Sequence, residues 1–232
     1  MTGVQTCALP ICRFKYDNKV FEVINAIVDL LVLGFFWIIT SIPVFTMGAS
    51  TTALYYTVNK SIRNKKGYAY REYWKAFKRN FKQATLCFLM WFVVAIFLVG
   101  DVIITKQVLR QDTQLGASYY FFLVLAGAAL AWEFYLFSYI ARFECTVMEA
   151  MKKSLFMMLA NLGWSAALVA IFMACLFLCR DMMSLFILLP GGFCAIKNYI
   201  LEKVFKKYRT PEDIARDRSE ERRVGKECRS RW

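Results

Sequence analysis

The sequence predicts an all-α protein: a polytopic bundle of helices that cross a lipid bilayer. Its hydrophobic content is 59% and its mean hydropathy is +0.42, above the range typical of soluble domains. Five stretches lack Asp, Glu, Lys and Arg, and four of them reach the roughly 18 residues that mark a candidate span. A soluble core helix would carry a polar face at helical spacing, which these stretches lack. They are Leu30–Asn59, Gln83–Gly100, Thr113–Trp132, Ser154–Cys179 and Met182–Ile196.

The first uncharged stretch, Leu30–Asn59, is too long for one simple span. As a single helix it would measure about 45 Å, against a hydrocarbon core of about 30 Å. Pro43 and Gly48 interrupt it, and Pro removes a helical hydrogen bond. We favour a helical hairpin, with a span at 24–42 and a partial or re-entrant leg at 46–59. One long span with an external N-terminus is the alternative.

The other spans are expected at 83–103, 115–140, 157–179 and 182–200, giving five or six membrane segments. Basic residues crowd the segments 60–82, 142–153 and 197–209, whereas the loops at 101–116 and 180–181 balance their charges. Because Lys and Arg concentrate in cytoplasmic loops, we expect these basic segments and the C-terminus inside the cell. The last span includes Lys197, whose long stem could reach the headgroups by snorkelling.

One amphipathic helix is expected at 68–82, on the cytoplasmic side. It combines aromatic side chains at helical spacing with many cations, which suits the headgroup layer of an anionic membrane. A connector helix packed under the bundle is the alternative, and the two interpretations are compatible. We expect no nucleic-acid partner, since no nucleic-acid-binding fold surrounds this segment. The basic residues expected to face lipid are Lys75, Lys78, Arg79 and Lys82.

Glu133 is the one carboxylate well inside a predicted span, and such acids are candidate functional residues. A structural role, with its carboxylate bonded to a neighbouring Tyr or reaching an interface, is the stronger alternative. Asp29 marks the start of the first span and suits a helix-terminal position. A small transporter or channel would use these two acids and the first hairpin.

The residue types argue against an enzyme and against a bound cofactor or metal. The chain has no histidine, which removes the commonest general base and zinc ligand. Its eight cysteines form no CxxC pair, and most lie in apolar stretches where Cys packs as a small hydrophobe. We therefore expect a non-catalytic protein whose constant partner is the lipid bilayer.

Two segments resemble the YesL family of small bacterial membrane proteins. They are IPVFTMGASTTALYYTVNKSIR and GYAYREYWKAFKRNFKQA, and weaker likeness extends over residues 14–213. The resemblance implies a single membrane domain at 13–217 in the bacterial cell membrane. It also implies an accessory role beside sugar ABC transporter subunits, by association with carbohydrate uptake. The motif residues it singles out are Pro43, Thr46, Gly48, Thr52, Tyr55, Tyr56, Phe77, Asn80 and Phe81.

The residue types in the first motif suit helix packing. Gly48 permits a turn or a close approach between helices, and Thr46 can bond backbone groups freed at a turn. We therefore expect a mainly structural duty for this motif.

The two ends of the chain do not fit the membrane protein between them. Residues 1–12 and 218–232 translate in frame from common short-read sequencing adapters. We expect both segments to be artefacts without packed structure, and we exclude them from the fold.

Overall fold

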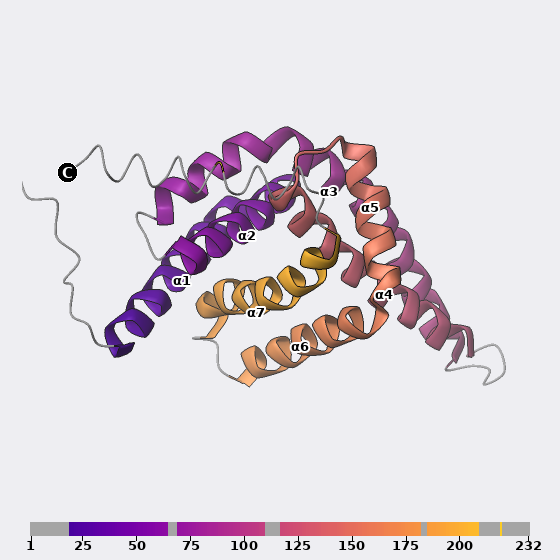
Figure 1. The fold of residues 1–232 in the computed structure, drawn as a ribbon. Helices are drawn as coiled ribbons and strands as arrows, with labels where there is room; N and C mark the ends of the chain where they lie inside the picture. Colours follow the sequence, from indigo (N-terminus) through magenta and orange to yellow (C-terminus); the bar gives the residue numbers. More distant parts are fainter. Residues whose placement is uncertain (1–18, 65–68, 110–116, 182–184, 209–218, 220–232) are drawn as a thin grey trace, which may run out of the picture.

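The computed structural model describes residues 19–64, 69–109, 117–181, 185–208 and 219. These residues form seven α-helices, one short 3-10 helix and no strands (Figure 1). This confirms the predicted all-α class. Apart from Ser219, the segments interpreted as adapter sequence lie outside the described residues. The elements are α1 (Lys19–Ser41), η1 (Val44–Thr46), α2 (Met47–Asn64), α3 (Ala69–Leu109), α4 (Ala117–Arg142), α5 (Val147–Ala160), α6 (Leu162–Asp181) and α7 (Leu185–Tyr208).

The first uncharged stretch folds as a hairpin and not as one long helix. Helix α1 ends at Ser41, and η1 separates it from α2. The indole Nε1 of Trp37 donates to Thr51 Oγ1 over 3.3 Å, although a continuous helix would separate these residues by about 21 Å. The chain therefore reverses at residues 42–46, as the interrupting Pro43 suggested.

Helix α2 lies at the centre of the bundle. It packs against α1, α3, α4 and α7, and its most extensive contact is with α3. Most of its residues from Gly48 to Asn59 are buried. The second leg of the hairpin is thus the core of the fold, and the other helices surround it.

The predicted amphipathic helix and the span after it form one helix. Helix α3 runs for 41 residues without interruption, because no Pro or Gly occurs between Ala69 and Val99. In Figure 1 its first turns cross the top of the bundle before it descends along one side. The separate helix expected at 68–82 is therefore corrected to the first turns of α3.

The span expected at 157–179 is divided between two helices. Helix α5 ends at Ala160, and α6 begins at Leu162. Asn161 separates them, and its side-chain Nδ2 donates to the carbonyl oxygen of Met157 over 2.9 Å. An Asn amide that bonds the last turn competes with helix continuation, so the chain turns here.

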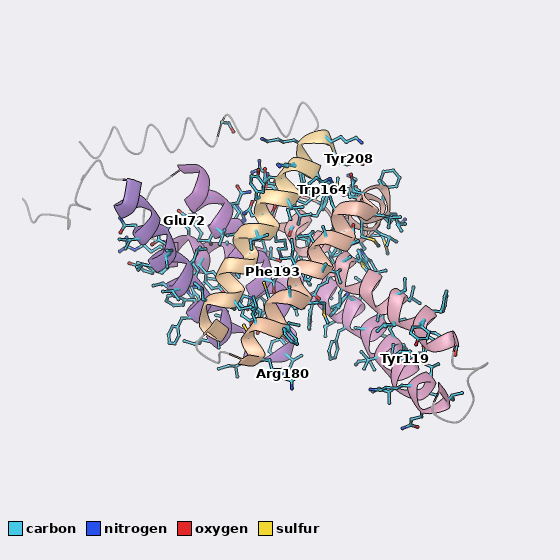
Figure 2. The ribbon with its side chains drawn as sticks, turned by 90° about the horizontal axis from the view of Figure 1, so that it is seen from below. Glu72, Tyr119, Trp164, Arg180, Phe193 and Tyr208 are labelled. Atoms are coloured by element: carbon cyan, nitrogen blue, oxygen red, sulfur yellow. The ribbon has the colours of Figure 1, made fainter. Side chains whose placement is uncertain are left out.

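Four helices are long and apolar enough to cross a membrane: α1, α3, α4 and α6. Their exposed faces are apolar, so the chain is an integral membrane protein. Helix α7, which contains most of the span expected at 182–200, is not among the four. Figure 2 shows Tyr208 and Trp164 toward one end of the molecule, and Arg180 and Tyr119 toward the other. This division agrees with loops that alternate between two sides of a bilayer.

Candidate functional site

Thr46 fixes the turn between α1 and α2. Its Oγ1 lies 2.6 Å from the carbonyl oxygens of both Thr40 and Pro43. Thr40 Oγ1 in turn lies 2.6 Å from Tyr73 Oη of α3. Because these bonds join the end of α1, the turn and α3, the motif residues Pro43 and Thr46 hold the hairpin in place.

Gly48 allows three helices to meet at one point. A Cβ at this position would lie 2.7 Å from the Ala84 carbonyl oxygen of α3, and 2.9 Å from Phe137 Cε1 of α4. It would also lie 2.7 Å from Phe88 Cβ. Real Cβ atoms do not come this close to backbone oxygen, so any larger residue must push the helices apart.

Four Ser and Thr hydroxyl groups of α2 bond backbone carbonyl oxygens one helical turn earlier. Thr52, which is fully buried, donates from Oγ1 to the Gly48 carbonyl oxygen over 2.8 Å. Ser50, Thr51 and Thr57 bond the carbonyl four residues earlier in the same way. These bonds remove the cost of burying a free hydroxyl, and therefore allow a polar helix to occupy the centre of an apolar bundle.

The aromatic motif residues belong to α2 and α3. Tyr55 is 1% exposed, whereas Tyr56 is half-buried and carries the Arg79 guanidinium 4.8 Å from its ring centroid. Phe77 contacts Phe81, with ring centroids 5.4 Å apart. Of these contacts, the one between Tyr56 and Arg79 joins α2 to α3.

Asn80 is a buried motif residue whose side-chain Nδ2 has no hydrogen-bond partner among the described residues. A buried N–H group of this kind is costly unless it is paired. We find no structural reason for its presence on the buried face of α3.

Lys197 and Glu133 place opposite charges inside the bundle. Lys197 is 2% exposed, and its Nζ lies 5.4 Å from the ring centroid of Tyr55 and 5.9 Å from that of Phe134. It attracts Glu133 of α4 electrostatically, although no direct hydrogen bond or ion pair joins the two described side chains; Glu133 is half-buried. The intramembrane acid therefore lies within the electrostatic influence of a buried cation on α7. Snorkelling of Lys197 to the headgroups was the wrong expectation, because the rings of α2 and α4 enclose its ammonium group.

A buried polar ladder continues from this pair along α2 and α7. Asn59 Nδ2 donates to Asn198 Oδ1 over 2.9 Å and to Glu202 Oε1 over 2.7 Å. Asn198 Nδ2 donates to the Tyr55 carbonyl oxygen over 3.4 Å. Arg142 Nε lies 3.4 Å from the same Glu202 oxygen. The ladder thus joins α2, α7 and the end of α4.

These groups lie at different depths of the bundle. Glu133 precedes Arg142 by nine positions on α4, or about 14 Å of helix. Polar side chains therefore extend from Glu133 in the middle of α4 to Arg142 at its C-terminal end.

The structure brings only part of the predicted site together. The ring of Tyr55 lies beside Lys197, which attracts Glu133 electrostatically. One motif residue is therefore close to the group that acts on the intramembrane acid. Pro43 and Thr46 lie at the hairpin turn, apart from this cluster in the chain. Asp29 is half-buried on α1, ten residues after the helix begins at Lys19, so it does not have the expected helix-terminal position. Its neighbour Leu30 lies close to α7: a Cβ on Gly191 would lie 2.4 Å from the Leu30 carbonyl oxygen.

Sequence reasoning missed the residues that complete the polar cluster: Asn59, Lys197 and Asn198. Their signal was present, because adjacent Lys and Asn interrupt an otherwise apolar stretch, with Glu202 one helical turn after Asn198. Polar residues in such stretches usually face the bundle interior and bond one another.

The basic residues expected to face lipid divide into two groups. Lys75, Lys78, Arg79 and Lys82 are all exposed on α3. Lys75 and Lys78 line a surface hollow beside Trp74, whereas Arg79 covers Tyr56 of α2. Tyr73 is fully buried, so the aromatic face of this segment packs partly on the core and partly faces outward. The segment therefore packs on the bundle through Tyr73, and contact of its exposed face with lipid headgroups stays a prediction.

Residues 30–102 match the model of a family described as a protein of unknown function, DUF624. The matched range begins in α1 and ends in α3, so it includes the hairpin, α2 and all the motif residues singled out above. No curated protein and no solved structure matches the chain. The likeness to the YesL family stays a prediction.

Proposed function

We propose that the chain is a non-catalytic accessory subunit that assembles with a membrane permease, in the bacterial cell membrane and with its C-terminus in the cytoplasm. The observation that supports this role is the internal pairing of its intramembrane polar groups. Asn59 and Asn198 bond each other, and Lys197 lies against two aromatic rings. Such pairing stabilises a fixed bundle whose apolar outer faces are available to lipid or to other helices.

The proposed partner class is the permease of a carbohydrate ABC importer. It derives from the family resemblance and from the association of that family with sugar uptake. No catalytic step is proposed, since the chain has no histidine to act as a general base.

Affinity purification in mild detergent tests the proposal. The tagged full chain should enrich permease subunits over a tagged polytopic membrane protein of similar abundance from the same cells. Recovery of the chain without permease subunits, both in detergent and after crosslinking in the intact membrane, would contradict the accessory role.

A small transporter or channel is the second candidate function, favoured by one observation. Lys197, which attracts Glu133, is adjacent in sequence to Asn198 of the polar ladder that leads to Arg142, and rows of buried ionisable residues carry protons or ions in transporters. Flux through proteoliposomes that is abolished by Glu133→Gln would support this function. Flux that survives both Glu133→Gln and Asp29→Asn would remove the two acids from any transport mechanism.

A further inference from the structure

A hollow opens on the surface where the first turns of α3 lie beside α1. It has a volume of about 430 Å³ and is lined by Phe36 of α1 together with Tyr70, Arg71, Trp74, Lys75 and Lys78 of α3. Residues 71, 74, 75 and 78 are spaced three or four apart, which places them on one face of the helix. The hollow thus combines three cations with three aromatic rings.

The lining carries net positive charge. None of the described residues that line the hollow is acidic. The acid nearest to the lining residues in the sequence is Glu72. Its carboxylate lies 2.7 Å from Lys60 Nζ of α2, which balances its charge. An anion in the hollow would therefore meet a lining with three cationic side chains and no carboxylate among its described residues.

Aromatic rings hold two of the cations at the rim. Lys78 Nζ lies 5.8 Å from the ring centroid of Trp74, and Arg71 Nε donates to Tyr70 Oη over 2.9 Å. The rings themselves are exposed, at 46% for Trp74 and 44% for Tyr70. Amphipathic aromatic residues beside cations are typical of the level where phospholipid headgroups lie.

The hollow continues onto an apolar stripe of α1. Phe36 lines the hollow, and the exposed residues of α1 recur every three or four positions below it. This stripe belongs to a helix long and apolar enough to cross the membrane. Its exposed residues are Ile24, Ile27, Val28, Leu31, Val32, Phe35 and Ile39.

We propose that this hollow binds one anionic phospholipid. Its phosphate lies between Arg71, Lys75 and Lys78, its glycerol region contacts Trp74 and Phe36, and its acyl chains follow the α1 stripe. Guanidinium and ammonium groups bind phosphate oxygens by charge-assisted hydrogen bonds, which accounts for the preference for an anionic headgroup. The proposal does not depend on the accessory role, because it requires only that α1 and α3 span the membrane.

Native mass spectrometry of the full chain tests the site. Protein stripped of lipid in mild detergent is titrated with phosphatidylglycerol or phosphatidylcholine, and bound lipid is counted. The wild type should retain one phosphatidylglycerol in preference to phosphatidylcholine. Its apparent affinity for phosphatidylglycerol should fall about tenfold or more in the Arg71→Gln, Lys75→Gln, Lys78→Gln variant.

The matched control removes three exposed charges elsewhere: Lys152→Gln, Lys153→Gln, Lys206→Gln. This control should bind like the wild type. Equal loss in the two triple variants would show attraction to overall charge and would overturn the site, as would unchanged binding in the hollow variant. The single Lys78→Gln change, expected to lose about fivefold, keeps the test independent of how the triple variant folds.

Inorganic phosphate distinguishes the lipid from a free anion. We expect it to compete only weakly, because it lacks the acyl chains that contact α1. Displacement of the lipid by phosphate at an equal concentration would contradict the assignment to a phospholipid.

Discussion

Helices α2 and α6 both belong to the bundle, but the more polar helix, α2, is buried, whereas the more apolar helix, α6, is exposed. Helix α2 contains five Ser and Thr residues, and most of it is buried at the centre of the molecule. Helix α6 has no polar residue between Ala166 and Cys179, yet Phe177 is 66% exposed and Leu178 is 59% exposed. A water-soluble protein would place these two helices the other way round.

The inversion shows what stabilises each helix. In a bilayer the apolar surface of α6 gains nothing from burial in protein, because lipid is equally apolar. Helix α2 instead gains from close packing at Gly48 and from polar bonds such as that between Asn59 and Asn198. Substitutions should therefore be costly around α2 and tolerated on the outer face of α6.

The largest effect is expected from Lys197→Met. It removes the buried cation that lies beside the rings of Tyr55 and Phe134 and attracts Glu133, and the loss of these interactions should cost about 3 kcal/mol in the free energy of unfolding. Unfolding of the purified protein in mixed micelles with increasing SDS measures the change. The double variant Glu133→Gln, Lys197→Met should recover most of the loss. Additive losses in the double variant would mean that the two charges do not interact.

Gly48→Val should be the next most damaging change, at about 2 kcal/mol, because the new side chain meets the Ala84 backbone. Gly163→Val on α6 is the matched control, since nothing lies within 4 Å of a Cβ there. The difference between the two variants in the SDS unfolding midpoint tests the packing at the hairpin. Similar losses at both glycines would contradict the close approach of α2, α3 and α4.

Asn59→Leu should cost about 1.5 kcal/mol, because it removes the donor to both Asn198 and Glu202. Leu178→Met on the exposed face of α6 should change stability by less than about 0.5 kcal/mol. Hydrogen exchange at the end of α2 provides a second measurement, since it should quicken in Asn59→Leu alone. An unchanged exchange rate at the end of α2 in Asn59→Leu would show that the polar ladder does not stabilise this helix.

Apart from the control substitutions, the smallest loss of stability is expected at the start of α5, outside both compared helices. The Thr146 side chain accepts from the Glu149 backbone N–H over 3.4 Å, and the Thr146 backbone N–H donates to Glu149 Oε2 over 3.2 Å. Thr146→Ala should cost about 1 kcal/mol, and circular dichroism during thermal unfolding can measure it. Thr146→Ser, which keeps the capping oxygen, should behave like the wild type.

The same cap predicts a pH dependence. The hydrogen bond from the Thr146 backbone, followed by the charge of Lys153, lowers the pKa of Glu149 below its ordinary value of 4.5. Stability from this carboxylate is therefore fully present above pH 4.5 and is lost as the pH falls through the lowered pKa. Between the lowered pKa of Glu149 and pH 4.5, the free energy of unfolding should change less with pH in Glu149→Gln than in the wild type. Parallel profiles would contradict the cap.

Hydropathy and charge predicted the helical membrane class, and Pro43 correctly marked the reversal of the chain. Hydropathy and charge could not predict that α2 is central, because in a membrane protein the apolar content of a helix does not determine whether it packs inside the protein or faces lipid. They also assigned Lys197 to the headgroups, since a sequence does not show that the rings of Tyr55 and Phe134 enclose its ammonium group. The division at Asn161 was missed because it interrupts no apolar pattern.

Labelling from within the lipid phase tests the central arrangement most directly. A hydrophobic diazirine, photoactivated in proteoliposomes of the wild-type chain, labels side chains in contact with acyl chains, and peptide mass spectrometry locates the label. We expect strong labelling of residues 166–179 in α6 and little labelling of residues 48–59 in α2. Labelling of α2 at the level of α6 would contradict a bundle built around a buried polar helix.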